Sequence, residues 1–187
     1  MVKLNKIYTK TGDSGETGLS DGSRLPKYAL RVAAMGAVDE ANSAIGIARL
    51  ESEDEMDAML ARIQNDLFDL GADLSMPEKT SAKTAPLRIT GAQVERLERE
   101  IDAMNATLEP LTSFVLPGGT ALAAHLHLAR AITRRAERLI AELAVKEKLN
   151  PAALAYVNRL SDHLFVMARA ANNAGMGDVL WVPGGTQ

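Results

Sequence analysis

The 187-residue sequence contains no cysteine, which excludes disulfides and thiolate chemistry. Aromatic residues make up only 4% of the chain, so a core has to be built mainly from aliphatic side chains. The net charge of -3 provides no electrostatic basis for binding nucleic acid or an anionic membrane. There is no apolar run of about 18 residues, and the N-terminal stretch lacks the apolar centre of a signal peptide. These absences predict a cytoplasmic protein without a nucleic-acid or membrane partner.

What the chain does contain is hydrophobic periodicity. Its 47% hydrophobic and 24% charged residues fit a single globular domain. Apolar residues recur at spacings of three and four in successive segments, and no strand-like alternation competes with them. This rhythm favours shallow crossing angles, so the expected fold is an all-α, five-helix, left-handed bundle. The first expected helix covers about residues 27–50 and carries a stripe of small residues. The second runs from a Ser52/Glu55 capping box to Pro77, and the third from a Thr90/Gln93 box through Leu108. The fourth has an apolar stripe from Leu122 to Leu143, and the fifth runs from the Asn150 cap and Pro151 through Ala171.

The fourth helix carries an excess of positive charge. Arg130, Arg134, Glu137 and Arg138 recur at helical spacing and share one side, whereas Arg135 points elsewhere. One interpretation is an exposed basic stripe that pairs with neighbouring acids. The other is a clamp for a polyanion, because guanidinium groups bind phosphate oxygens in a bidentate manner.

Polar residues also interrupt two other helices. Asn158 and Asp162 lie one turn apart on the fifth helix and are expected to face together, with Arg159 between them. Asp39 and Asn42 lie beside the small-residue stripe of the first helix. These side chains are either ordinary surface groups or half-buried groups that need partners.

Residues 8–21 read "YTKTGDSGETGLSD" and cannot form a stable helix, because three glycines are spaced through them. Such a segment is either a surface tail or a loop whose backbone N–H groups and hydroxyls surround phosphate oxygens. In the second case Asp13 is a possible partner for magnesium or a hydroxyl, and Lys27 follows on the first helix. The Walker phosphate-binding motif is absent.

Six sequence blocks follow one another along almost the whole chain. In order they read "KIYTKTGDSGETGLSDGSRLPK", "GAVDEANSAIG", "LFDLGADLS", "SFVLPGG", "ARAITRRAERLI" and "YVNRLSDHLF". Together they cover about residues 6–171 and resemble the PduO-type ATP:cob(I)alamin adenosyltransferase family. The resemblance implies a five-helix bundle assembled as a homotrimer. It also implies that ATP is held between the opening loop of one subunit and the fourth and fifth helices of its neighbour, and that the loop orders around the nucleotide.

The resemblance implies roles for individual residues as well. Asp39 and Arg130 match a pair that joins adjacent subunits beside the corrin. Phe114 matches an aromatic residue that packs on the corrin and keeps the lower axial ligand away from cobalt; the alternative for it is an ordinary core phenylalanine. The expected catalytic residues are Arg134, Asp39, Arg130 and Phe114. The expected cobalamin contacts are Phe114, Asp39, Arg130 and Asp162. The expected ATP contacts are Thr9, Lys10, Thr11, Gly12, Asp13, Gly15, Thr17, Gly18, Lys27, Arg134, Arg135, Glu137, Arg138 and Asn158.

The implied reaction transfers the 5′-deoxyadenosyl group of ATP to the cobalt of cob(I)alamin and releases triphosphate. Co(I) is itself the nucleophile, so no catalytic serine, cysteine or histidine is needed. Mg²⁺ is expected to be held mainly through the phosphates, with no protein ligand assigned. The expected partners are ATP, cob(II)alamin or cob(I)alamin, further copies of the chain, and a flavoprotein reductase.

Within one domain, the expected divisions are 1–26 for the ATP-binding loop, 27–173 for the bundle and 174–187 for a tail. Leu180 and Trp181 in the tail are candidates to cover the corrin. Two other functions fit the same residues. One is an ATP-binding helical sensor without transferase chemistry, and the other is a trimeric scaffold whose arginines only join subunits.

Overall fold

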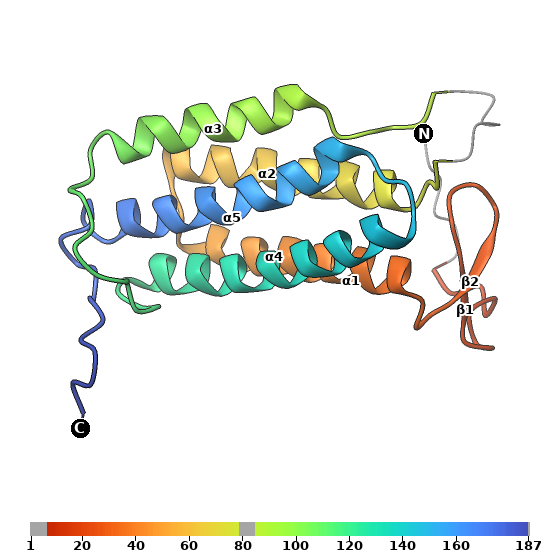
Figure 1. Ribbon diagram of the computed structural model, residues 1–187, viewed down its shortest axis with the longest axis horizontal. Helices are drawn as coiled ribbons and strands as arrows, with labels where there is room; N and C mark the ends of the chain where they lie inside the picture. The colour runs from red at the N-terminus through yellow and green to blue at the C-terminus, as the bar shows by residue number, and fades with distance from the viewer. Residues whose placement is uncertain (1–6, 79–84, 187) are drawn as a thin grey trace.

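The computed structural model describes residues 7–78 and 85–186. The five expected helices are present and pack lengthwise as a bundle (Figure 1). α1 packs on α4 and α2, α4 packs on α5, and α3 covers α5 along the upper edge. A short 3-10 helix, η1, joins α1 to α2. The bounds are α1 Leu30–Ala48, η1 Arg49–Glu51, α2 Asp54–Leu74, α3 Gly91–Asn105, α4 Ala121–Lys146 and α5 Pro151–Ala171.

The expectation that the chain has no strands was wrong, because the opening segment forms a small hairpin. β1 (Glu16–Gly18) pairs antiparallel with β2 (Arg24–Pro26). Strands this short carry too few residues to display an alternating pattern. Their turn is closed by the backbone N–H of Ser23, which donates to the Asp21 carboxylate at 2.9 Å. The hairpin therefore depends on local turn chemistry.

Two helix starts also differ from prediction. α1 begins at Leu30, so Lys27 precedes the helix. The predicted Ser52/Glu55 capping box was wrong, because Glu53 occupies the cap position of α2 without a side-chain cap. Ser52 instead donates to Asp57 at 3.1 Å, and Arg49 holds the same carboxylate with two bonds at 2.7 and 2.8 Å. Glu55, the other member of the expected box, accepts from Arg62 at 3.1 Å.

The other two predicted starts are confirmed. Thr90 and Gln93 form a capping box on α3. Asn150 caps α5 by accepting from the backbone of Ala152 at 3.1 Å, with Pro151 at the first helical position.

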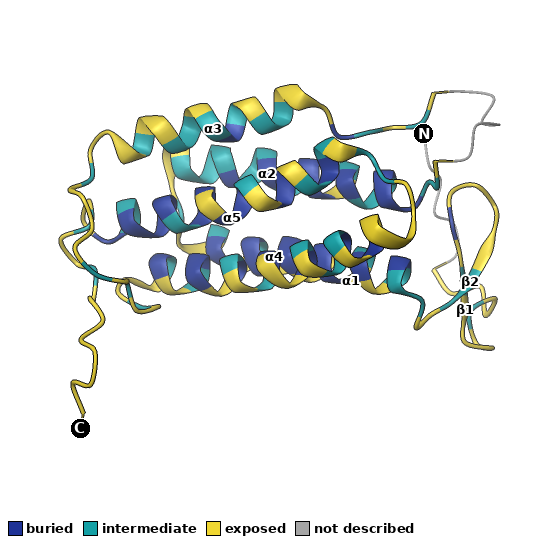
Figure 2. Ribbon diagram, viewed as in Figure 1, coloured by how far each residue is buried: buried dark blue, intermediate teal, exposed yellow. Residues whose placement is uncertain are grey.

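The core lies where the inner faces of the helices meet, and their outer faces are exposed (Figure 2). The expected stripe on α1 faces α4 and lets the two helices approach closely. Its first member, Leu30, is only half-buried. The other members are buried as expected: Ala34, Ala37, Ala41, Ala44 and Ala48.

Within the described part of the chain, no helix is both long and apolar enough to cross a bilayer.

Two loop regions lie at opposite ends of the bundle (Figure 1). The β1–β2 hairpin lies at the end of the bundle where α1 begins and α4 ends. Residues 106–120, which include Phe114, lie at the opposite end together with the C-terminal tail. A single chain therefore keeps the hairpin and the Phe114 segment apart.

Candidate active site

The arginine-bearing edge of α4 meets α5 in a polar cluster. Arg134 lies 3.4 Å from the Ser161 hydroxyl and 3.6 Å from the Glu137 carboxylate. Asn158 donates to the same carboxylate at 2.9 Å. The predicted grouping of Arg134, Glu137 and Asn158 is thus present in the structure. Ser161, which was not among the predicted site residues, completes the cluster.

Arg130 lies one turn before this cluster and is poorly compensated. Its Nε is buried and has no hydrogen-bond partner among the described residues. Burial, and to a lesser degree the charge of Arg134, lowers the pKa of the Arg130 guanidinium. A half-buried cation of this kind favours a bound anion or a polar ligand. This supports the clamp interpretation at the Arg130–Arg134 end of the edge.

The remaining two arginines of this helix differ from each other. Arg135 forms an exposed ion pair with Glu40 of α1, as expected for a side chain that points away from the shared edge. Arg138 lies one turn after Arg134 on α4 and is exposed.

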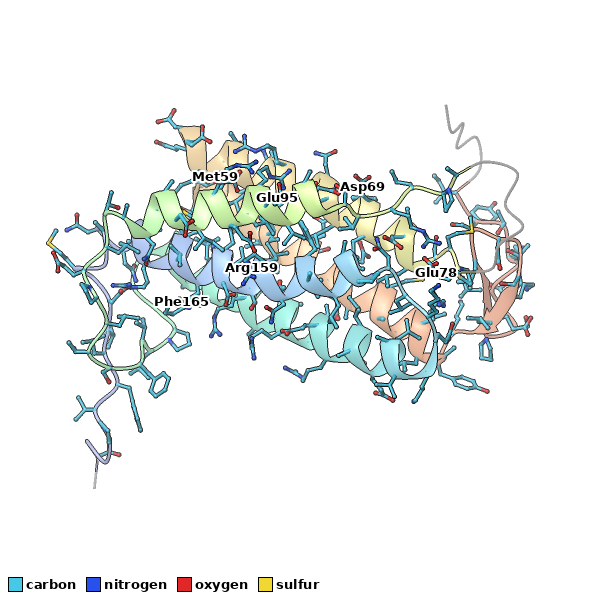
Figure 3. All side chains as sticks on the ribbon, turned by 45° about the horizontal axis from the view of Figure 1, so that its top comes forward. Met59, Asp69, Glu78, Glu95, Arg159 and Phe165 are labelled. Atoms are coloured by element: carbon cyan, nitrogen blue, oxygen red, sulfur yellow. The ribbon has the colours of Figure 1, made fainter. Side chains whose placement is uncertain are left out.

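Phe114 lines a cavity of about 480 Å³ at the end of the bundle. Its side chain is 76% exposed, which rejects the alternative of an ordinary core phenylalanine. Arg130 and Phe165 line the same cavity, so two of the predicted cobalamin residues come together in one chain. In Figure 3, Phe165 lies near the end of α5 that faces the Phe114 segment.

A buried histidine lies behind this cavity. The ring of His127 packs edge-on against Phe165, with centroids 6.1 Å apart. Neither ring nitrogen has a hydrogen-bond partner among the described residues. Burial and the nearby Arg130 charge lower the pKa of His127, so the neutral imidazole is favoured there. Spacing alone gave no role for this residue.

The other predicted cobalamin residues lie outside the cavity. Asp39 is exposed on α1 and lines a groove of about 530 Å³ beside the hairpin, together with Gly18 and Phe68. Asp162 forms an ion pair with Arg159 at 3.3 Å. Asn158, one turn earlier on the same helix, donates a hydrogen bond to Glu137 instead. Within one chain, the structure does not bring Asp39 to Arg130.

The opening loop folds back on itself before the hairpin. The Thr9 and Thr11 hydroxyls lie 2.9 Å apart, and the backbone N–H of Asp13 donates to the Lys10 carbonyl at 3.3 Å. Arg24 donates to the Thr11 carbonyl at 2.7 Å. Arg24 was not among the predicted site residues, and only the folded hairpin brings it to this loop.

Lys27 lies against the glycines of the loop. The backbone N–H of Lys27 donates to the Gly15 carbonyl at 2.8 Å. A Cβ on Gly12 would be 3.2 Å from the Lys27 ammonium, so glycine leaves room for this cation. Gly15 has a φ of 85°, which favours glycine. Thr17 and Gly18 continue the loop as part of β1. The predicted ATP-binding residues that precede α1 therefore form one polar loop with Lys27 beside it.

Among residues 7–78 and 85–186, no group of three or more histidine, aspartate or glutamate side chains is arranged to hold a metal ion. Asp13 is an exposed carboxylate within the loop itself.

Known proteins of one family resemble this chain over nearly its whole length. The family model "Cobalamin adenosyltransferase" matches residues 7–171. A corrinoid adenosyltransferase of Mycobacterium tuberculosis (strain H37Rv) is 50% identical over 98% of this chain and 96% of its own length. A cobalamin adenosyltransferase of Cupriavidus metallidurans is also 50% identical, over 96% of this chain and 95% of its own length.

Solved structures show the same relationship. The structure of a phenylalanine-to-alanine variant of the PduO-type ATP:corrinoid adenosyltransferase from Lactobacillus reuteri, complexed with cobalamin and ATP, is 40% identical with a TM-score of 0.87. It covers 94% of this chain and 99% of that chain. An arginine-to-lysine variant from the same organism, complexed with ATP, gives a TM-score of 0.84. Fold, motifs and overall length all agree, and the chain belongs to the cobalamin adenosyltransferase family.

Proposed function

We propose that the protein transfers the 5′-deoxyadenosyl group of ATP to the cobalt of cob(I)alamin, forming adenosylcobalamin and triphosphate. The observation that carries this proposal is the cavity in which an exposed Phe114 lies beside the uncompensated Arg130, one turn from Arg134. An apolar wall and adjacent cations suit a large apolar ring system next to a polyanion. The names of the relatives support the same activity.

The active site is completed between subunits of a homotrimer. The hairpin and the Phe114 segment lie at opposite ends of one chain, which supports a site made from two copies. In this arrangement the opening loop and the Asp39 face of one subunit meet α4 and α5 of its neighbour. Asp39 would then compensate the half-buried charge of Arg130. Arg135 and Arg138 would line the same seam.

The chemical step needs orientation and charge stabilisation. The electron pair of Co(I) attacks C5′, the C5′–O bond breaks, and triphosphate leaves with the bonding electrons. Arg134 is positioned by Ser161 and Glu137, and 48% of its side chain is exposed and available to the phosphates. Lys27 and the backbone N–H groups of the opening loop stabilise negative charge from the other subunit. No residue has to remove a proton.

Mg²⁺ would be held mainly by the phosphates, with Asp13 as the carboxylate of the loop that suits it. When bound, the ion neutralises charge on the triphosphate leaving group. Phe114 acts earlier, in the reduction of cobalt by an electron donor such as a flavoprotein. Its ring keeps the lower axial ligand from cobalt, and the four-coordinate Co(II) accepts an electron more readily.

The test is an assay of purified protein with ATP, Mg²⁺ and chemically reduced cobalamin. We expect the cob(I)alamin absorbance to be replaced by that of a light-sensitive alkyl product, with one triphosphate released per adenosyl group transferred. ATP binding without this spectral change would support the sensor instead. A folded oligomer that binds no ATP would support the scaffold.

A further inference from the structure

The C-terminal tail forms a short strand pair with the segment that carries Phe114. The backbone N–H of Trp181 donates to the Phe114 carbonyl at 2.7 Å, and that of Leu116 donates to the Val179 carbonyl at 2.8 Å. Val115 and Leu180 are paired as an antiparallel bridge between these bonds. The backbone of Phe114 is therefore held by hydrogen bonds to the tail.

Asp178, directly before this strand pair, is anchored in a buried ion pair. Arg169 of α5 donates to its carboxylate at 2.8 Å, and the two side chains are only 7% and 3% exposed. Asn172 donates to the other carboxylate oxygen at 3.1 Å. Arg169 also donates to the Glu109 carbonyl at 2.8 Å, at the start of the Phe114 segment. A buried pair with this many hydrogen bonds is costly to break.

The same group fixes the far end of the Phe114 segment. Asn172 accepts from the backbone of Thr120 at 2.9 Å and donates to the Gly118 carbonyl at 3.2 Å. A Cβ at Gly119, where φ is 102°, would overlap the Asn172 amide. Arg169 and Asn172 thus hold residues 109 and 118–120, while Asp178 ties the tail to both.

Phe114 itself has little packing to fix its position. Its side chain is largely exposed, and its ring lies against that of Trp181, at 6.0 Å between centroids. Its place in the cavity therefore depends on its own backbone and on the tail. Both of these depend on the buried group at the end of α5.

We propose that Asp178, Arg169 and Asn172 form a positioning group that holds Phe114 in the cavity through the C-terminal tail. They act through Phe114 and do not themselves contact the reacting atoms. The inference rests on the proposed function for the role of Phe114, but the docking of the tail is independent of it. Loss of this group releases the tail and lowers the fraction of molecules in which Phe114 can exclude the axial ligand.

Asp178→Asn tests this in the full-length protein, because it keeps the shape of the side chain and removes its charge. Trp181 is the only tryptophan, so its fluorescence reports on the tail without cobalamin. We expect quenching by acrylamide to rise about threefold as the tail is released. With cob(II)alamin and ATP, we expect the electron paramagnetic resonance signal of four-coordinate Co(II) and the rate of its reduction to fall about tenfold. Transfer from preformed cob(I)alamin should change by less than about twofold, because Arg134 is untouched.

Asp73→Asn is the matched control, since Asp73 is also a buried carboxylate paired with an arginine, Arg88, at 2.6 Å. Asp73 lies near the end of α2, beside the start of α3. The Asp73→Asn variant should have lower stability than the wild type but unchanged Trp181 quenching and an unchanged Co(II) signal. Phe114→Ala provides the value for complete loss. Ser113→Ala removes the hydrogen bond from the Ser113 hydroxyl to the Trp181 carbonyl, at 2.7 Å. It should raise Trp181 quenching and lower the Co(II) signal by smaller amounts than Asp178→Asn, and it can be measured even if Asp178→Asn does not fold.

Wild-type quenching and an unchanged Co(II) signal in a folded Asp178→Asn protein would overturn the inference. So would the same losses in Asp73→Asn, or an unchanged Ser113→Ala protein where Asp178→Asn fails to fold. If wild-type protein transfers no adenosyl group from preformed cob(I)alamin, the proposed function fails, while the quenching data still decide whether Asp178 docks the tail.

Discussion

Two sets of charged residues lie on the same bundle and differ in how they are compensated. Between α2, α3 and α5, the buried Asp66 accepts hydrogen bonds from Gln93 at 3.0 Å, from Tyr156 at 2.7 Å and from Arg96. On α4, Arg130 is half-buried, and its Nε has no partner among the described residues. The Arg96 charge is paired with the Asp66 carboxylate, although the Nε of Arg96 also lacks a hydrogen bond. No ion pair among residues 7–78 and 85–186 compensates the charge of Arg130.

The presence or absence of partners distinguishes structural charges from ligand-binding charges inside a helical protein. A buried carboxylate with several donors stabilises the packing of its helices and leaves little capacity for a ligand. A cation that is desolvated without a partner is costly to the free protein, and that cost is recovered when a ligand or a second subunit binds. We therefore assign the α4 edge to the proposed site and the Asp66 network to the fold.

The comparison is tested most strongly at Arg134. In Arg134→Ala we expect adenosyl transfer to fall about 100-fold, because the charge that faces the phosphates is lost. The melting temperature should change by less than about 2 °C, since the side chain is half exposed. The measurement is kcat/KM with preformed cob(I)alamin, beside a thermal melt.

Arg159→Ala is the control for that variant. Arg159 is of similar exposure, lies on α5 and pairs with Glu98 at 3.0 Å, outside the cavity. Equal activity losses in the two variants would remove the distinction between the arginine-bearing edge and the rest of the surface.

Asp66→Asn is the corresponding change in the network. It removes the nearer of the two carboxylates beside Arg96, leaving Glu100 at 3.6 Å, and weakens the acceptor of Tyr156. We expect the free energy of unfolding, measured by urea denaturation, to fall by about 3 kcal/mol. Transfer per folded molecule should remain near that of the wild type. A large activity loss without loss of stability would mean that the network serves the site.

The smallest expected effect is a pH dependence of the stability that Glu100 contributes. Burial tends to raise the pKa of Glu100, but hydrogen bonds from His163 and Arg62 outweigh it and hold the pKa below the ordinary 4.5. The folded state therefore binds the proton less readily than the unfolded chain. Stability from Glu100 is present above the ordinary pKa and is lost as pH falls through the lowered value.

The measurement is the difference in unfolding free energy between wild type and Glu100→Gln at neutral pH and at acid pH. We expect a difference of about 1 kcal/mol at neutral pH that shrinks on acidification. A difference that grew as pH fell would show that the carboxylate is protonated more readily in the folded protein.

Much of the fold was predictable because it is encoded locally. The three-and-four spacing located all five helices, and Thr90, Gln93 and Asn150 marked two starts correctly. The hairpin and η1 were missed because three-residue elements are too short to carry a period. The Ser52 prediction failed because Arg49 and Asp57 compete for the same polar groups.

The site was predictable where one helix or two neighbouring helices supply it. Arg134, Glu137 and Asn158 came together as expected, and Arg130 met Phe114 in one cavity. The link from Asn172 to Thr120 joins residues 52 positions apart, so spacing carries no signal for it. The contacts of Arg24 with Thr11 and of Ser161 with Arg134 also join residues that are distant in sequence, so spacing did not predict them.

The length of α4 has a consequence for mixtures of defective chains. Its 26 residues extend roughly 39 Å, more than the reach of a single nucleotide. In the proposed assembly each copy would therefore contribute its hairpin to one site and its Phe114 end to another. If sites form between chains as proposed, damage at the hairpin and damage at Phe114 need not add when they reside in separate polypeptides. Co-assembly of two inactive variants would leave some seams with both halves intact, and activity would reappear from parents that have none.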